Sequence, residues 1–167
     1  MTQEQVPFTQ WASVHRTDRF ISIEPLSGYR RALREDEGYV IYLKPDVGDE
    51  ALGRGLLEAL DKSRFIHPDD ERSFFKWERI DQCFRNWEKD FMRRCGYKTK
   101  RDAYKNMNWC QVERSEGVIS IRPRQRRAKP GEWLWLPPEQ NVVISETRDA
   151  AAVGAALRLA WDRCEIA

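Results

Sequence analysis

The chain has 167 residues, of which 41% are hydrophobic and 34% charged, and its formal net charge is only +2. This length predicts a single domain over residues 1–167 with a sizeable core, and the aromatic content excludes a disordered chain. Because the net charge is nearly neutral, polyanion binding would have to come from a local patch of basic residues.

Neither a targeting segment nor a membrane span is predicted. The N-terminal stretch MTQEQVPFTQW has no basic region followed by an apolar one, and no apolar run is long enough to cross a bilayer. We therefore expect a soluble, cytoplasmic protein without a membrane partner. The four cysteines and two histidines lack zinc-site spacing, so we expect no metal, no cofactor and cysteines packed as small apolar side chains.

The first third of the chain predicts three strands. Apolar and polar residues alternate over 11–16 and 19–25 on either side of Thr17-Asp18, a pattern typical of a hairpin. The charged segment 27–37 predicts a loop or a sheet edge. A third strand is predicted over 39–43, because Pro45 ends the apolar run.

Two helices are predicted next. Four leucines recur on one face of a helix over residues 50–63. A longer helix is predicted from Pro68 to Gly96, since the acidic residues at 69–71 follow a proline and aromatic residues then recur every three or four positions. The alternative to one continuous helix is a kink or break near Trp77.

The stretch 96–123 predicts the centre of the fold. A short basic helix over 99–105 leads into a hairpin, whose first strand alternates over 109–114 and whose return strand covers 118–121. Ser115-Glu116-Gly117 supplies the turn, with Gly117 at a positive φ. Two adjacent antiparallel strands of this kind belong in the middle of a sheet.

The last part predicts strands at 133–136 and 141–145 and a closing helix over 148–164, with Pro137-Pro138 breaking the ladder between the strands. The order β-β-β-α-α-β-β-β-α separates strands from helices. It favours a single-domain α+β fold, in which helices cover a mainly antiparallel central sheet.

Candidate catalytic residues are scarce. His15 and His67, together with a lysine, could hydrolyse RNA by general acid–base catalysis, but nothing in the sequence brings them into one cleft. Motifs of serine hydrolases, nucleotide-binding loops and zinc proteases are absent. We therefore expect no catalytic residues and no enzyme.

A basic patch supports an alternative function. Lys98, Lys100, Arg101 and Lys105 have tyrosines interleaved and could follow a phosphate backbone, as could the arginines of 122–127. The acidic runs restore near neutrality, so nucleic acid is not the expected partner. A small nucleic-acid-binding module or ribonuclease, using Lys98 to Lys105 and His15 with His67, remains the alternative.

Acidic runs and a tryptophan pair are candidates for protein binding. Carboxylates on a rigid surface would be steered to the electropositive cleft of a nucleic-acid-cleaving enzyme, although helix capping also explains those at 69–71. Two tryptophans beside the diproline could anchor a partner. The candidate partner-binding residues are Glu35, Asp36, Glu37, Asp69, Asp70, Glu71, Trp133 and Trp135.

Three stretches carry a family resemblance. They are LGRGLLEALDKSR at 52–64, GYKTKRDAYKNMNWC at 96–110 with the following ISIRP, and VGAALRLAWDRC at 153–164. In this order they resemble the immunity proteins of bacterial contact-dependent growth inhibition (CDI) systems, across most of the chain.

The resemblance implies a cytoplasmic, non-enzymatic protein that binds and neutralises the C-terminal toxin domain of its cognate large surface-exposed effector. Toxins of these systems are commonly nucleases, which agrees with the carboxylate argument. The residues that carry the resemblance are implied to be scaffold: Tyr97, Lys98, Lys105, Asn106, Cys110, Arg158 and Cys164. The chain departs from the family pattern at 30–37 and 133–138, where toxin specificity is expected.

Overall fold

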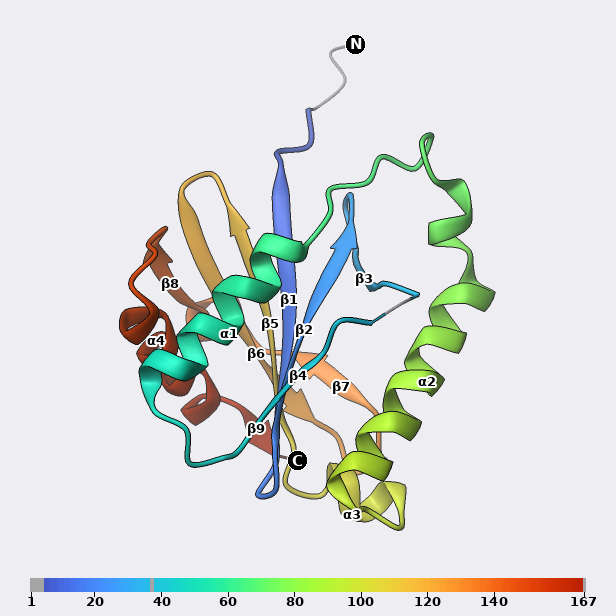
Figure 1. Cartoon of the computed structure of the whole chain (residues 1–167), viewed down its shortest axis with the longest axis vertical. Helices are drawn as coiled ribbons and strands as arrows, with labels where there is room; N and C mark the ends of the chain where they lie inside the picture. The colour runs from blue at the N-terminus through green and yellow to red at the C-terminus, as the bar shows by residue number, and fades with distance from the viewer. Residues whose placement is uncertain (1–4, 37, 167) are drawn as a thin grey trace.

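The computed structural model describes residues 5–36 and 38–166 and contains one curled sheet with helices on both faces (Figure 1). The strands are β1 (Thr9–Arg16), β2 (Ile21–Gly28), β3 (Ala32–Arg34), β4 (Ile41–Leu43), β5 (Asn108–Ser115), β6 (Val118–Arg126), β7 (Trp133–Trp135), β8 (Val142–Ser145) and β9 (Glu165–Ile166). The helices are α1 (Asp49–Lys62), α2 (Trp77–Cys95), α3 (Lys100–Tyr104) and α4 (Ala150–Asp162).

The sheet is mainly antiparallel, with the strand order β3-β2-β1-β5-β6-β7. In addition, β4 pairs with β2, while β8 and the short parallel β9 pair with β6. The predicted α+β class and the order of the main elements are confirmed. The three-residue strand β3 forms the edge where the sequence predicts a loop or an edge.

The hairpin of β5 and β6 lies in the middle of the sheet, as predicted. Ser115 pairs with Val118, and the two turn residues Glu116 and Gly117 have φ values of 51° and 81°. Two positive φ values suit a two-residue turn, whose twist matches that of the flanking strands. β1 pairs with β5 along its whole length and so fixes the hairpin in the sheet.

The main core lies on the face covered by α1 and α4. Strand alternation sends Val14, Ile23, Val112 and Ile121 to this face, and the four leucines predicted on one side of α1 are buried against them. Burying one such side chain contributes about 1.5–3 kcal/mol before chain entropy is subtracted. The amphipathic pattern of α1 is therefore confirmed.

The opposite face of the sheet is polar although much of it is buried. The alternate residues of β1 and β2 here include Ser13, His15, Ser22 and Glu24, all of them buried. α2 and α3 cover part of this face through an aromatic cluster that contains Phe91. The uncovered part of the face remains open beside α2.

The helix start predicted at Pro68 is wrong. Residues 68–70 form a turn, Arg72–Phe75 is a 3₁₀ helix, and α2 begins only at Trp77. Phe74 is buried against Leu33 and Ile66, which directs the chain along β3 before the long helix begins. The aromatic spacing runs across this break, which lies just before Trp77, where a kink or break was the alternative prediction from the sequence.

Among the described residues no helix is both long and apolar enough to cross a membrane. The four cysteines are thiols, and three of them are buried, in agreement with the prediction that they pack as small apolar side chains.

Candidate functional site

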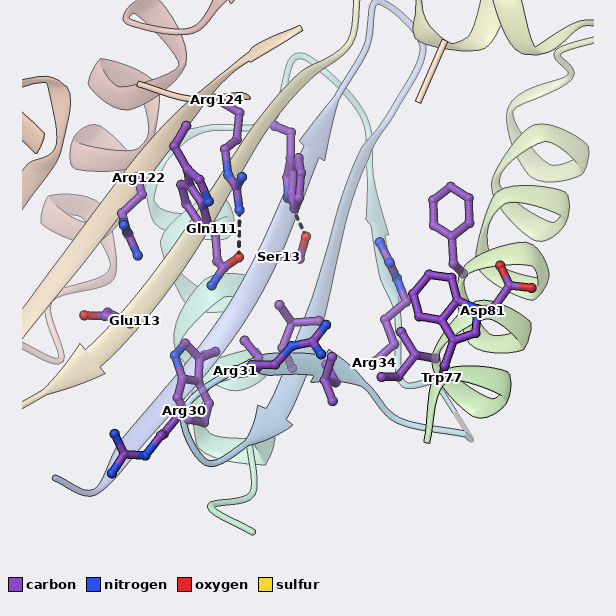
Figure 2. Close-up of a pocket in the computed structure, with 18 residues that line it drawn as sticks. Ser13, Arg30, Arg31, Arg34, Trp77, Asp81, Gln111, Glu113, Arg122 and Arg124 are labelled. Carbon is purple, nitrogen blue, oxygen red and sulfur yellow. Dashed lines mark hydrogen bonds between the residues drawn. The ribbon is translucent and has the colours of Figure 1, made fainter. Parts of the chain in front are cut away.

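The open part of the polar face is a groove of about 590 Å³, lined by five arginines (Figure 2). β1, β5 and β6 form its floor, β3 and the preceding turn form one side together with the start of α2, and β7 contributes Trp135. We call it the arginine groove, after Arg30, Arg31, Arg34, Arg122 and Arg124.

Arg124 is the most enclosed of these arginines, with only 7% of its surface exposed. Its guanidinium lies against the rings of Trp109 and Trp135, with Cζ 4.3 Å from the centre of the Trp109 ring. One nitrogen, Nη2, donates to Gln111 Oε1 at 3.2 Å, but Nε has no hydrogen-bond partner among the described atoms. Two aromatic faces thus stabilise a cation that lacks a full set of acceptors.

The groove carries more positive charge than its own carboxylates balance. Among the described side chains, Arg34 pairs with the buried Glu24, with 2.8 Å between Nε and Oε1. The other four groove arginines have no described carboxylate within ion-pair distance. Burial, followed by the charge of Arg122, lowers the pKa of Arg124 to about 9, so this side chain is still a cation at neutral pH.

His15 lies beside this groove, on the same face of β1 as Ser13, and is enclosed by indole rings. Its ring stacks on Trp109 at 5.4 Å between centres and tilts against Trp87 at 4.4 Å. Burial lowers the pKa of His15 well below 6.5, and the charges of Arg34 and Arg124 lower it further. The imidazole is therefore neutral in the folded protein.

The neutral His15 predicts an acid-sensitive stability. Below pH 6.5 the unfolded chain binds a proton at this residue that the folded chain excludes, so the free energy of unfolding should fall by up to about 1.4 kcal/mol per pH unit. Urea unfolding of the wild type and of His15→Phe from pH 7.5 to 5 would measure the contribution of His15 to this slope, which the variant should lack. His67→Phe, at an exposed position, is the matched control. Equal slopes in wild type and His15→Phe would contradict the assignment.

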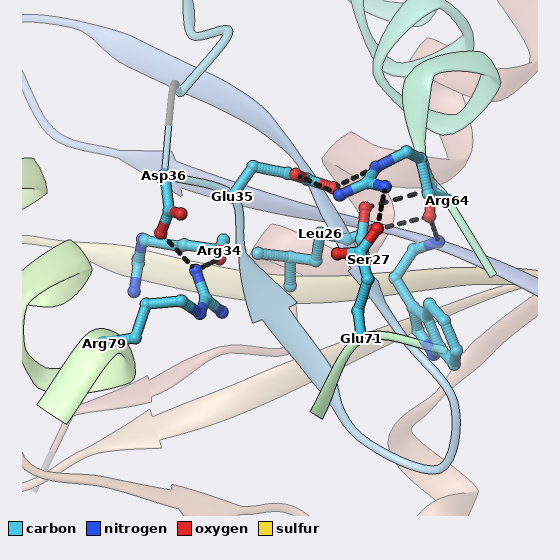
Figure 3. Close-up of polar contacts among 10 residues, drawn as sticks. Leu26, Ser27, Arg34, Glu35, Asp36, Arg64, Glu71 and Arg79 are labelled. Carbon is cyan, nitrogen blue, oxygen red and sulfur yellow. Dashed lines mark hydrogen bonds and ion pairs between the residues drawn. The ribbon is translucent and has the colours of Figure 1, made fainter. Parts of the chain in front are cut away.

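Three of the predicted acidic residues form ion pairs with arginines of the same chain (Figure 3). Arg64 donates to both oxygens of Glu35 at 2.8 Å and to Glu71 at 3.1 Å, while Arg79 donates to Asp36 at 2.8 Å. Burial opposes the ionisation of Glu35, but the hydrogen bonds from Arg64 lower its pKa on balance. These carboxylates already have counterions within the chain, which weakens the field that they could present to a basic partner.

The remaining predicted residues are more dispersed. Asp69 and Asp70 are exposed in the turn before the 3₁₀ helix, and Glu37 lies outside the described residues. Trp133 is half-buried and packs edge-to-face on Trp109 at 5.4 Å, whereas Trp135 lines the arginine groove and is 48% exposed. The structure thus brings one of the two tryptophans into the groove itself.

The two histidines of the alternative function, a ribonuclease, lie far apart. His15 pairs across the ladder with Ser22, whereas His67 packs on Tyr29 beyond the other end of β2. The six residue steps along β2 from Ser22 to Gly28 correspond to about 20 Å, so the two histidines do not share one cleft.

One of the two tyrosines interleaved in the basic patch near α3 is buried. Tyr104 is only 2% exposed and donates to Glu88 at 2.6 Å, and Lys100 pairs with the same carboxylate at 3.0 Å. A tyrosine packed in this way cannot stack on a base.

The candidate site residues that sequence reasoning did not bring together are the five groove arginines. The sequence assigns Arg30, Arg31 and Arg34 to a charged loop or edge, and Arg122 and Arg124 to a run that could follow phosphates. The alternation of Arg122 and Arg124 with Ile121 and Pro123 was a usable signal, since it puts both arginines on one face of a strand. No group of side chains suited to a metal ion occurs among the described residues.

Comparisons with known proteins agree with this fold. The family model described as CDI immunity protein matches residues 10–164. The chain is 33% identical to the immunity protein CdiI-YPIII of Yersinia pseudotuberculosis serotype O:3 (strain YPIII), over 93% of this chain and 95% of the relative.

Solved structures show the same similarity. A chain of the CdiA-CT/CdiI toxin and immunity complex from Yersinia pseudotuberculosis superposes with a TM-score of 0.88 at 31% identity, covering 96% of this chain and 100% of that chain. A protein of unknown function from Neisseria meningitidis gives a TM-score of 0.86 at 30% identity, covering 99% of this chain and 100% of that chain. The resemblance seen in the sequence is confirmed, and the chain belongs to the CDI immunity protein family.

Proposed function

We propose that this chain binds the toxin domain of a cognate CDI effector and neutralises it. The observation that carries the proposal is the similarity, over nearly the whole chain, to a chain of a toxin and immunity complex. Neutralisation here means a stable complex rather than turnover. The separation of His15 from His67, and the enclosure of His15 by indoles, support binding over hydrolysis.

The proposal has finer parts that follow from the family. We infer that the toxin domain belongs to a large surface-exposed effector, that it is a nuclease, and that the immunity protein meets it in the cytoplasm. The candidate contact residues are those predicted from the sequence, of which Trp135 lines the arginine groove and Glu35 directly follows the groove residue Arg34. The two segments that depart from the family pattern, 30–37 and 133–138, contribute residues to its two sides.

Co-expression in a bacterial host tests the proposed function. Inducing the cognate toxin domain should stop growth, and this chain should restore viability by several orders of magnitude, because a stoichiometric inhibitor with nanomolar affinity leaves little active toxin. A toxin domain from an unrelated effector is the control and should remain lethal. Persistent growth arrest by the cognate toxin, in cells that contain the folded chain, would contradict the proposal.

A further inference from the structure

The arginine groove gathers four arginines that have no ion-pair partner among the described side chains. Outside it, arginines commonly have a carboxylate of the same chain, as Arg64 has Glu35 and Arg114 has Asp61. In the groove, Arg30, Arg31, Arg122 and Arg124 have none within ion-pair distance among the described side chains. The missing negative charge points to a ligand from outside the chain.

Arg124 gives the strongest indication. Removing a guanidinium from water is costly unless acceptors replace the lost hydration, and this side chain is more than nine-tenths buried with its Nε unpartnered. Burial also lowers the pKa of Arg124 to about 9, which agrees with a cation that lacks a counterion. A carboxylate that entered the groove would supply acceptors in a geometry that suits a guanidinium.

We propose that the arginine groove binds an acidic segment of the cognate toxin domain, one carboxylate of which pairs with Arg122 and Arg124. The proposal rests on the proposed function, because it names the surface through which the toxin is held. Trp135 lies over the Arg122 guanidinium, with 4.1 Å from Cζ to the ring centre, and offers an exposed apolar side to the same segment.

Arg30 and Arg31 have a different part in this interaction. Both are exposed on the turn before β3, below Arg122 and Arg124 in the view of Figure 2, where they remain hydrated and accessible before the complex forms. Exposed charges of this kind raise the rate of association with an oppositely charged partner, and salt weakens the effect. Arg122 and the buried Arg124 should instead control dissociation.

Charge complementarity favours a protein segment over a nucleic acid. Glu113 and Asp81 also line the groove, so a continuous phosphate backbone would approach two carboxylates. A peptide can place a carboxylate beside Arg124 and keep its other charges away from Glu113. A groove of about 590 Å³ also accommodates a few side chains of such a segment.

Binding kinetics between the purified chain and its purified cognate toxin domain test this proposal. The Arg122→Gln/Arg124→Gln double variant should bind at least about 100-fold more weakly, mainly through faster dissociation, because two charge-assisted contacts are lost. Its melting temperature should equal or exceed that of the wild type, since an uncompensated buried charge is removed. A merely structural Arg124 would give the opposite change in melting temperature.

A second variant keeps the test decisive if the double variant fails to fold. Arg30→Gln/Arg31→Gln changes only exposed side chains and should slow association by about threefold to tenfold at low salt. The matched control is Arg101→Gln in α3, an exposed arginine outside the groove, which should bind like the wild type.

Several outcomes would overturn the proposal. Wild-type affinity in both groove variants would remove the groove from the interface while leaving the proposed function intact. Weakening by Asp69→Asn/Asp70→Asn instead would move the interface to the acidic turn. Binding of a single-stranded RNA oligonucleotide that only the groove variants lose would identify nucleic acid as the occupant. If the wild-type chain itself fails to bind the toxin, both the proposed function and the groove assignment fail.

Discussion

Gly154→Ala should destabilise the protein by about 3 kcal/mol or more, although the same change inside an ordinary helix stabilises by up to about 1 kcal/mol. The reason is the crossing of α1 and α4, where a β-carbon on Gly154 would overlap the carbonyl oxygen of Asp49. Gly53 lies opposite, and a β-carbon there would overlap the carbonyl oxygen of Ala150. Because backbone rather than a flexible side chain blocks the space, the two helices have to move apart.

Urea unfolding monitored by tryptophan fluorescence measures this effect as a lower midpoint. Gly55→Ala is the matched control on α1, because its β-carbon would meet the flexible end of Ile23 at 3.1 Å and should change stability by less than about 1 kcal/mol. A Gly154→Ala variant with the wild-type midpoint would show that α1 and α4 separate at little cost.

The parts of the fold that the sequence predicts well are those fixed by local pattern. The hairpin of β5 and β6 combines strict alternation with a Glu116-Gly117 turn, and α1 has its leucines on one face, so each element specifies its own structure. The predicted start of this helix at Pro68 was too early, because the aromatic spacing continues through residues 72–75 although α2 begins only at Trp77. There a tertiary contact, Phe74 with Leu33 and Ile66, decides where the helix begins.

The groove could not be predicted because it depends on strand order. Arg34 lies on β3 and Arg124 on β6, and the sheet places β2, β1 and β5 between these strands. No local pattern shows that a charged edge segment and a return strand 90 positions later (124 − 34) line one groove. The acidic run at 35–37 was visible in the sequence, but its pairing was not, because Arg64 lies 29 positions from Glu35 and Arg79 lies 43 positions from Asp36.

The second large effect is expected at the ion pair of Arg34 and Glu24, which holds the β3 side of the groove. Arg34→Met should cost about 3–5 kcal/mol, because it leaves the carboxylate of Glu24 buried without a counterion. The Glu24 side chain is 4% exposed and that of Arg34 is 19% exposed. Glu24→Met should therefore cost less than Arg34→Met, since water can still reach part of the remaining guanidinium.

The dependence on pH separates this charge effect from lost packing. Burial already raises the pKa of Glu24 despite the opposing charge of Arg34, and loss of Arg34 raises that pKa further. A carboxyl group with a raised folded pKa binds its proton more readily when folded, so the stability lost in Arg34→Met at pH 7.5 should be partly regained as the pH falls toward 5. Loss of packing alone would give the same deficit at both pH values.

A double-mutant cycle completes the test. In Glu24→Met/Arg34→Met both charges are replaced by apolar side chains of similar length, so the double variant should recover most of the stability that Arg34→Met loses. Denaturant midpoints of the four proteins at pH 7.5 and pH 5 give the coupling energy. Additive losses that do not change with pH would mean that Glu24 is stabilised without Arg34, and that the edge strand is held to the sheet by its backbone pairing with β2 and by apolar contacts alone.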